Sequence, residues 1–303
     1  MLRSVLLYLS EQKRLQNFIL RRRLARKLAR RFVAGETLDE AIQVTRELNA
    51  QGMEVTLDYL GESVENEDQA ILATDAYIGI LERVDQEKVR TGISIKLTQI
   101  GLAIDEDLCG RNLRRIAEAA RAFNNFVRID MEASEYVKST LRLFHGLHVE
   151  FKMLGAVIQS YMRRSESDVR KLAAGGASVR LCKGAYMEPE GVAFQKKAQV
   201  DANYVRLLEI LIDSGSPVAV ASHDLRMIDA AKNLMKDNSS RKASVEFQML
   251  YGVRRDLQTE LVGDGYRMRV YVPYGTEWYP YFMRRMAERP ANLLFVLRAL
   301  KGK

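Results

Sequence analysis

Eight strand-like runs alternate with helical stretches, and this rhythm constrains the fold more than any other feature of the 303-residue chain. Near-continuous apolar strands separated by helices indicate a parallel sheet covered by helices, and eight such strands close a (β/α)₈, or TIM, barrel. The predicted strands are Glu54–Leu60, Gly92–Leu97, Phe126–Met131, Leu154–Ser160, Ser178–Cys182, Pro217–Ser222, Ser244–Met249 and Met268–Pro273. Amphipathic stretches between them include Asp107–Phe123, Lys197–Asp213 and Leu225–Lys236.

The spacing of these elements does not exclude a doubly wound open sheet, which is the alternative fold. The first strand is not followed by G-x-G-x-x-G, so the dinucleotide-binding version of that fold is disfavoured. We expect an N-terminal helical segment over residues 1–50 and a barrel over 51–303. Thr37–Glu40 reads as a capping box that opens a helix running to about Ala50, and Ser165–Asp168 is predicted to cap another helix.

The positive charge of the chain lies in its first 31 residues. The whole chain carries +8, whereas residues 1–31 contain ten Lys/Arg and a single acid, Glu11, so the remainder is close to neutral. Leu20, Leu24, Leu28 and Phe32 recur every four residues opposite the arginines, as in an amphipathic helix. Two hypotheses remain open: peripheral binding to an anionic membrane surface, or packing of the apolar face on the barrel.

Several partner and location classes are disfavoured by composition. Cys109 and Cys182 give neither a disulfide framework nor zinc spacing, so we expect a reducing, cytoplasmic location, with peripheral contact to the inner membrane face left open. An Arg-rich start is also compatible with a mitochondrial transit segment. The neutral body argues against nucleic acid. His145 and His148 are predicted to lie in a surface turn, and no metal site is expected.

Polar side chains stand at the carboxyl ends of seven predicted strands, where this fold builds its sites. A charged residue in an apolar strand is costly unless it is paired or faces a polar cavity, and the simplest interpretation of any single one is a buried ion pair. Seven strands ending in this way favour a functional pocket. The residues are Lys96, Asp130, Gln159, Arg180, His223 with Asp224, Gln248 and Tyr271.

A helix is predicted after the last strand, from about Pro280 to Arg289. At helical spacing its side chains Tyr281, Arg284, Arg285 and Glu288 share one face. Paired guanidinium groups match a carboxylate, so the face could clamp an acid, with the glutamate orienting the arginines. A solvated Arg/Glu helix face is the alternative.

The motifs together resemble those of proline dehydrogenases, in the order of that family and from about Val33 to the end. They are Ile95-Lys96-Leu97, Asp130-Met131-Glu132, Arg180-Leu181-Cys182-Lys183-Gly184-Ala185-Tyr186, Ser222-His223-Asp224, Glu246-Phe247-Gln248-Met249-Leu250 and Tyr281–Glu288. The resemblance implies a distorted barrel whose eighth helix covers the strand ends and which binds FAD without a Rossmann fold.

The resemblance also implies roles for individual residues. Lys96, Arg284 and Arg285 would bind the carboxylate of L-proline, with Glu288 bracing the arginines, and Asp130 would lie in the substrate-side network. Tyr271, Tyr281 and Leu250 would wall the ring. Residues assigned to FAD are Gln159, Arg180 (at the flavin N5 edge), Lys183, Gly184, Ala185, Tyr186, Lys197, Ser222 and His223. Cys182 departs from the aliphatic residue expected at its position.

The implied reaction is hydride transfer from L-proline to flavin N5, which gives Δ1-pyrroline-5-carboxylate in the first step of proline catabolism to glutamate, with a quinone as the expected electron acceptor. Lys96, Asp130 and Arg180 are the expected catalytic residues. The competing function is a phosphate-binding aldolase or isomerase barrel that uses Lys96 or Lys183. It requires a glycine-rich loop after strands seven and eight, for which Gly252 and Gly275 are weak candidates.

Overall fold

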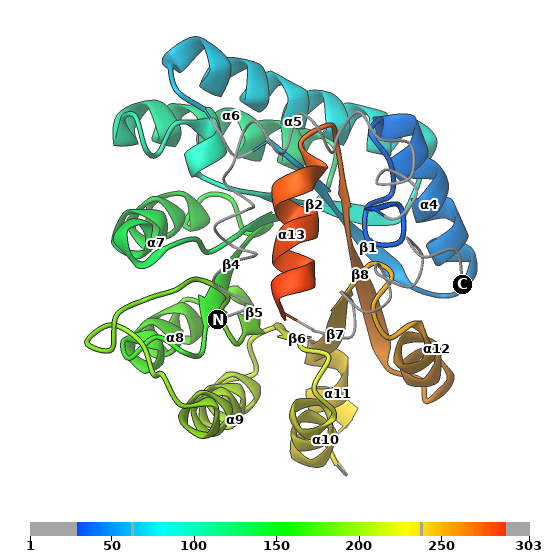
Figure 1. Cartoon of the computed structure of the whole chain (residues 1–303), viewed down its shortest axis with the longest axis vertical. Helices are drawn as coiled ribbons and strands as arrows, with labels where there is room; N and C mark the ends of the chain where they lie inside the picture. Colours follow the sequence, from blue (N-terminus) through cyan, green and yellow to red (C-terminus); the bar gives the residue numbers. More distant parts are fainter. Residues whose placement is uncertain (1–28, 62–63, 237–238, 289–303) are drawn as a thin grey trace.

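The computed structural model describes residues 29–61, 64–236 and 239–288 and contains a closed barrel of eight parallel strands, each paired with its neighbours in chain order (Figure 1). Strand β8 returns to pair with β1 and so closes the sheet. The barrel prediction is therefore confirmed, and the open-sheet alternative is wrong.

The strands are β1 (Glu54–Tyr59), β2 (Thr91–Ile95), β3 (Val127–Ile129), β4 (Leu154–Gln159), β5 (Ser178–Cys182), β6 (Val218–Ala221), β7 (Val245–Leu250) and β8 (Arg267–Tyr274). The helices of the outer layer are α4 (Leu38–Ala50), α5 (Glu67–Glu87), α6 (Glu106–Ala122), α7 (Ser134–His148), α8 (Ser165–Ala174), α9 (Lys197–Asp213), α10 (Leu225–Leu234), α11 (Ser239–Ser244) and α12 (Arg255–Gly263). A 3₁₀ turn, η1 (Thr98–Ile100), follows β2, and α13 (Trp278–Glu288) follows β8.

The two faces of the sheet differ in chemistry. Residues such as Ile93, Ile95, Val179 and Leu181 alternate along β2 and β5 and are buried in the main hydrophobic cluster, which also contains side chains from the surrounding helices. The alternate positions face the lumen and are polar. Arg180 of β5, for example, donates to Ser94 of β2, a strand that is not its neighbour. TIM-barrel interiors are usually filled by branched aliphatic residues, so this polar lumen marks the interior as the place to look for chemistry.

Helix α13 lies across the mouth of the barrel (Figure 1). Its apolar residues Trp278, Phe282 and Met286 form a second hydrophobic cluster that includes Leu60, which follows β1, and Val253, which follows β7. Because its neighbours come from loops beyond the strand ends, α13 closes the same end of the barrel at which the polar residues emerge. This confirms the expected final helix over the strand ends.

Of three local predictions, one is confirmed and two are wrong. The capping box at Thr37 and Glu40 is confirmed. The cap predicted at Ser165 is wrong: its hydroxyl donates to the carbonyl of Gln159, and Arg164 precedes the helix without a side-chain cap. The surface turn predicted for the two histidines is also wrong, because both lie in α7 and His148 is buried against Phe144, with ring centroids 4.8 Å apart.

Most of the basic amphipathic segment, residues 1–28, lies outside the described residues. At its described end, Ala29, Phe32 and Val33 are buried in the cluster with α13. Packing on the barrel is therefore the outcome for these three residues. Over the described ranges, no helix combines the length and the apolar character needed to cross a membrane.

Candidate active site at the barrel mouth

The centre of the site is a hydrogen-bonded group that we call the Asp130 network, consisting of Asp130, Arg180, Ser94 and Tyr271. Oδ1 of Asp130 accepts from Arg180 Nη1 at 2.7 Å and from Ser94 Oγ at 2.7 Å, while Oδ2 accepts from the hydroxyl of Tyr271 at 2.8 Å. Burial, reinforced by the charge of Asp130, raises the pKa of Tyr271 well above its ordinary value, so its hydroxyl stays a donor. Both carboxylate oxygens of Asp130 are thus committed to positioning its neighbours.

The guanidinium group of Arg180 is fixed from several sides. Its Nε donates to Oε1 of Gln248 at 2.5 Å, and its carbon stands 5.1 Å from the centroid of the Tyr271 ring. Among the described residues, Nη2 has no hydrogen-bond partner, although only 7% of the Arg180 side chain is exposed. The network therefore leaves one charged donor nitrogen for a bound group.

Lys96 directly follows β2 and forms a buried ion pair with Asp58 of β1, Nζ to Oδ1 at 2.9 Å. Burial raises the pKa of Asp58, and the ammonium group of Lys96 opposes that effect. A buried charge needs a partner, so Asp58 stabilises the cation that the resemblance assigns to a substrate carboxylate.

A second set of charges lies beside β5 and β6, and we call it the cation cluster: Lys183, Lys197 and Arg226, held by Asp201 and Asp224. Lys183 Nζ lies 2.5 Å from Asp201 Oδ1 and 2.7 Å from Asp224 Oδ2. Lys197 and Arg226 contact the same two carboxylates. Three cations against two anions leave one net positive charge, which suits an anionic ligand such as a diphosphate.

Predicted site residues outside the Asp130 network and the cation cluster also form hydrogen bonds at the strand ends. Gln159 Nε2 donates to the carbonyl of Glu132, and His223 Nε2 accepts from the backbone N–H of Leu250 at 3.0 Å. Ser222 Oγ accepts from the backbone of Asp224. These contacts join the end of β4 to the segment after β3, and the segment after β6 to the end of β7.

Gly184 follows β5 with φ +104, a conformation that side chains rarely adopt. A Cβ there would lie 2.3 Å from the ring of Tyr161, so the position requires glycine. The glycine therefore accommodates the Tyr161 ring that packs against it. Ala185 and Tyr186, which follow it, are exposed at the rim. The net positive charge of the cation cluster and the donor Nη2 of Arg180 fit the FAD that the family resemblance implies.

The predicted clamp lies on α13. Tyr281 is buried, Arg284 and Arg285 are half-buried, and the Arg285 guanidinium stands 5.1 Å from the centroid of the Tyr281 ring. Leu250, at the end of β7, packs against the cluster that contains Tyr281. Glu288 ends the helix, but its side chain is outside the described part of the chain. Tyr281 and Leu250 are thus brought together over the mouth.

Four residues of the site were not predicted from the sequence. Asp58 and Ser94 lie in β1 and β2, and Asp201 and Arg226 lie in α9 and α10. A polar residue near the end of an apolar strand was the available signal for Asp58. Asp201 lies four residues after Lys197 on one helix, a spacing that also predicts contact. Arg226 had no such signal.

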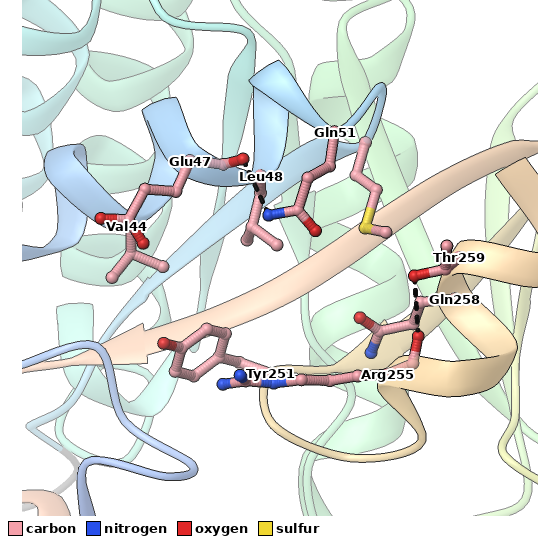
Figure 2. Close-up of a pocket in the computed structure, with 9 residues that line it drawn as sticks. Val44, Glu47, Leu48, Gln51, Tyr251, Arg255, Gln258 and Thr259 are labelled. Atoms are coloured by element: carbon pink, nitrogen blue, oxygen red, sulfur yellow. Dashed lines mark hydrogen bonds between the residues drawn. The ribbon is translucent and has the colours of Figure 1, made fainter.

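A small pocket of about 80 Å³ lies elsewhere, between α4 and α12 in the outer layer (Figure 2). None of its lining residues belongs to the predicted site. Two of its polar side chains are engaged by their own helices, since Gln51 donates to the carbonyl of Glu47 and Thr259 to that of Arg255. It is a gap between neighbouring helices.

The two glycines considered for a phosphate loop, Gly252 and Gly275, are required by backbone packing. A Cβ on Gly252 would lie 1.7 Å from the carbonyl oxygen of Arg31, and one on Gly275 would lie 3.0 Å from that of Leu60; both glycines have positive φ. Close backbone packing accounts for them without a phosphate. No group of metal-binding side chains occurs within residues 29–61, 64–236 and 239–288.

Comparison with known proteins supports one family. The proline dehydrogenase family profile matches residues 41–298. Proline dehydrogenase 1 of Bacillus subtilis (strain 168) is 41% identical over 303 residues, 100% of both chains, and proline dehydrogenase of Deinococcus radiodurans is 42% identical over 281 residues, 91% of both. Among solved structures, proline utilization A (PutA) of Bdellovibrio bacteriovorus inactivated by N-propargylglycine matches with a TM-score of 0.82 and 27% identity. That match covers 87% of this chain but 33% of the PutA chain.

Proposed function

The chain belongs to the proline dehydrogenase family and oxidises proline in the first step of proline catabolism; on that premise we propose how its residues carry out the reaction. Enzymes of this family depend on FAD, and FAD, when bound, would accept the hydride from the ring carbon next to the proline nitrogen. The product is Δ1-pyrroline-5-carboxylate. The observation that supports the mechanism is the Asp130 network, in which hydrogen bonds to one carboxylate hold the side chains of Arg180, Ser94 and Tyr271 in place.

Substrate binding is proposed to use charges from two elements at the mouth, the end of β2 and α13. Lys96, kept cationic by Asp58, and the pair Arg284 and Arg285 on α13 would hold the proline carboxylate. Glu288 is assigned to brace that pair. A fixed carboxylate orients the ring, and the walls formed by Tyr271, Tyr281 and Leu250 exclude water from the reacting carbon. Orientation is the main contribution of these side chains.

The cofactor is proposed to lie along the ends of β4, β5 and β6. Lys183 and Lys197 would face its diphosphate, and Arg180 would present Nη2 to the flavin N5 edge. The remaining contacts are assigned to Gln159, Gly184, Ala185, Tyr186, Ser222 and His223.

The nitrogen of proline must lose a proton before or during hydride loss. Asp130 is a poor candidate for that proton, because its two oxygens already accept three hydrogen bonds. We therefore assign Asp130 to positioning and the proton to solvent at the mouth. An Asp130→Asn variant that keeps slow turnover should retain the wild-type pH dependence. A profile that becomes flat in this variant would instead identify Asp130 as the group that takes the proton.

One absorbance experiment tests the function as a whole. The purified protein should be yellow, with non-covalent FAD that L-proline bleaches in the absence of oxygen. D-Proline serves as a matched control for ring chemistry without the correct orientation. A colourless protein that also fails to bind added FAD would contradict the mechanism.

Reoxidation of the flavin is proposed to use a quinone, and the basic residues 1–28 would bring a cytoplasmic enzyme to the inner membrane face. The support is their charge and apolar spacing alone. Full-length protein should sediment with anionic liposomes at low salt, and protein lacking residues 1–28 should not, while both reduce a soluble dye with proline. Failure of the full-length protein to sediment would exclude the membrane role.

A further inference from the structure

Gln248 joins two charged groups inside the barrel. Its side chain is buried; Oε1 accepts from Arg180 Nε and Nε2 donates to Glu246 Oε1, each at 2.5 Å. Guanidinium only donates and carboxylate only accepts. The amide of Gln248 satisfies both partners at once, with its oxygen toward the guanidinium and its nitrogen toward the carboxylate, and these contacts leave it a single orientation.

Glu246 is itself held in place from the β8 side. Arg269 Nε donates to its Oε1 at 3.0 Å, and Arg267 Nη2 donates to its Oε2 at 3.2 Å. Burial works to raise the pKa of Glu246, but the charge of Arg269 and the hydrogen bonds from Arg269 and Gln248 together outweigh burial and hold the pKa below its ordinary value. The carboxylate is therefore an anion at neutral pH and a permanent acceptor for the amide of Gln248.

The other end of this chain of contacts is Arg180. With Nε bound to Gln248 and Nη1 bound to Asp130 and Ser94, the guanidinium plane cannot turn without breaking a buried hydrogen bond. Its third nitrogen, Nη2, is the one that the described side chains leave over. The contacts of Nε and Nη1 thus determine where Nη2 lies.

We propose that Gln248, oriented by Glu246, is a positioning residue that aims Nη2 of Arg180 at the bound flavin. The inference rests on the proposed function, in which Arg180 meets the N5 edge. A positive donor at that edge stabilises the reduced flavin. Gln248 therefore sets the redox potential of the flavin and the rate of its reduction, while proline binding depends on Lys96 and α13.

The test uses the FAD-loaded enzyme and the variant Gln248→Met, which keeps the volume and removes both hydrogen bonds. We expect the two-electron midpoint potential to fall by about 30 mV, a tenfold change in the equilibrium. Flavin reduction by proline should slow about tenfold, while the proline dissociation constant changes less than twofold. Gln248→Asn, an amide too short to reach both partners, should act in the same direction and serves if the first variant does not fold.

Glu246→Gln separates positioning from simple charge. Loss of a nearby negative charge would by itself raise the potential, whereas loosening of Arg180 lowers it. We expect a fall smaller than that of Gln248→Met, and no further fall when Glu246→Gln is added to Q248M, because the glutamate acts through the amide. Glu54→Gln is the matched control, since Glu54 contacts Arg269 but not Gln248. The flavin midpoint potential in this variant should equal that of the wild type.

The outcomes distinguish this inference from the mechanism on which it rests. A normal potential in both Gln248 variants, or a higher one in Glu246→Gln, overturns the positioning role even though proline still bleaches the wild-type flavin. A wild-type protein that binds no FAD overturns the proposed function, and the inference with it.

Discussion

The two charged groups at the mouth of the barrel are built from similar ion pairs in different surroundings. Around β2, the side chains of Lys96 and Asp58 are 10% and 1% exposed. In the cation cluster beside β5 and β6, the side chains of Lys197 and Arg226 are 65% and 63% exposed. The same type of contact therefore lies in an almost dry interior on one side and close to bulk water on the other.

This difference predicts different energetic roles. Breaking a buried pair leaves a charge without solvent, whereas an exposed pair is screened and often contributes less than 1 kcal/mol. The buried side should thus determine stability and substrate binding and respond little to salt. The exposed side should contribute little to stability and should tune cofactor affinity in a salt-dependent way.

The largest effect is expected from Lys96→Met, which leaves Asp58 buried without its cation. Loss of one partner of a buried pair costs about 3–5 kcal/mol, measurable by urea unfolding. Adding Asp58→Asn should recover part of the loss, because the unpaired carboxylate is gone. Lys197→Met is the exposed counterpart and should cost less than about 1 kcal/mol; similar losses for the two lysine variants would contradict the contrast.

The next largest effect is expected from Arg284→Met or Arg285→Met, which should weaken substrate binding and leave the stability of the fold largely unchanged. A charge-assisted contact to a buried carboxylate contributes on the order of 2–4 kcal/mol. Proline should bind about thirtyfold to a thousandfold more weakly in anaerobic titrations, with FAD retained. Arg170→Met, a change in an exposed pair on α8, is the control. An unchanged dissociation constant for proline would remove that arginine from the clamp.

Lys183→Met should weaken FAD binding more than Lys197→Met does, because the side chain of Lys183 is 25% exposed and that of Lys197 is 65% exposed. A hydrogen bond to a charged group contributes about 1.5–3 kcal/mol, and an exposed pair less than about 1. Titration of FAD fluorescence at low and high salt separates the two. The Lys197 effect should largely vanish in salt, and a salt-independent effect would place that lysine in a buried contact.

Much of this arrangement could be predicted from the sequence, since apolar strand-like runs that alternate with amphipathic helical stretches are local patterns. Ser178–Cys182 was predicted with its observed bounds, and the strand-end rule located Lys96, Asp130 and Arg180. The capping prediction at Ser165 failed for a physical reason: the helix already includes Ser165, and its hydroxyl donates to the carbonyl of Gln159 at the end of β4 instead of accepting from a helix N–H. A local sequence pattern contains no information about such tertiary competition.

Partners across the barrel were also beyond local patterns. The contact between Arg180 and Gln248 joins residues 68 positions apart, and that between Tyr271 and Asp130 joins residues 141 apart. The family resemblance implied functional roles for the residues at the strand ends. Only the closed barrel indicates that Asp130 is saturated with donors and that Asp58 pairs with Lys96.

The smallest expected effect is a loss of stability at low pH that depends on Asp224. Burial works to raise the pKa of Asp224, but hydrogen bonds from Lys183 and Arg226 outweigh it and hold the pKa well below the ordinary value of 3.8. A lowered folded-state pKa means that the unfolded chain binds the proton more readily. The associated stability is therefore complete above about pH 4 and is lost as pH falls below it. Partial exposure limits it to less than about 1 kcal/mol.

Asp224→Asn sharpens the comparison at this low end. The variant should melt slightly below the wild type near neutral pH, and the two melting curves should converge as pH falls from about 5 to about 2, because the wild-type carboxylate becomes neutral as well. Added salt should shrink the gap near neutral pH, as expected for a cluster close to water. Asp229→Asn is the control on the same helix, with no ion pair found in the described residues. A gap that persists at low pH, or one that salt leaves unchanged, would mean that Asp224 stabilises the mouth by packing and that the cation cluster is as dry as the Lys96–Asp58 pair.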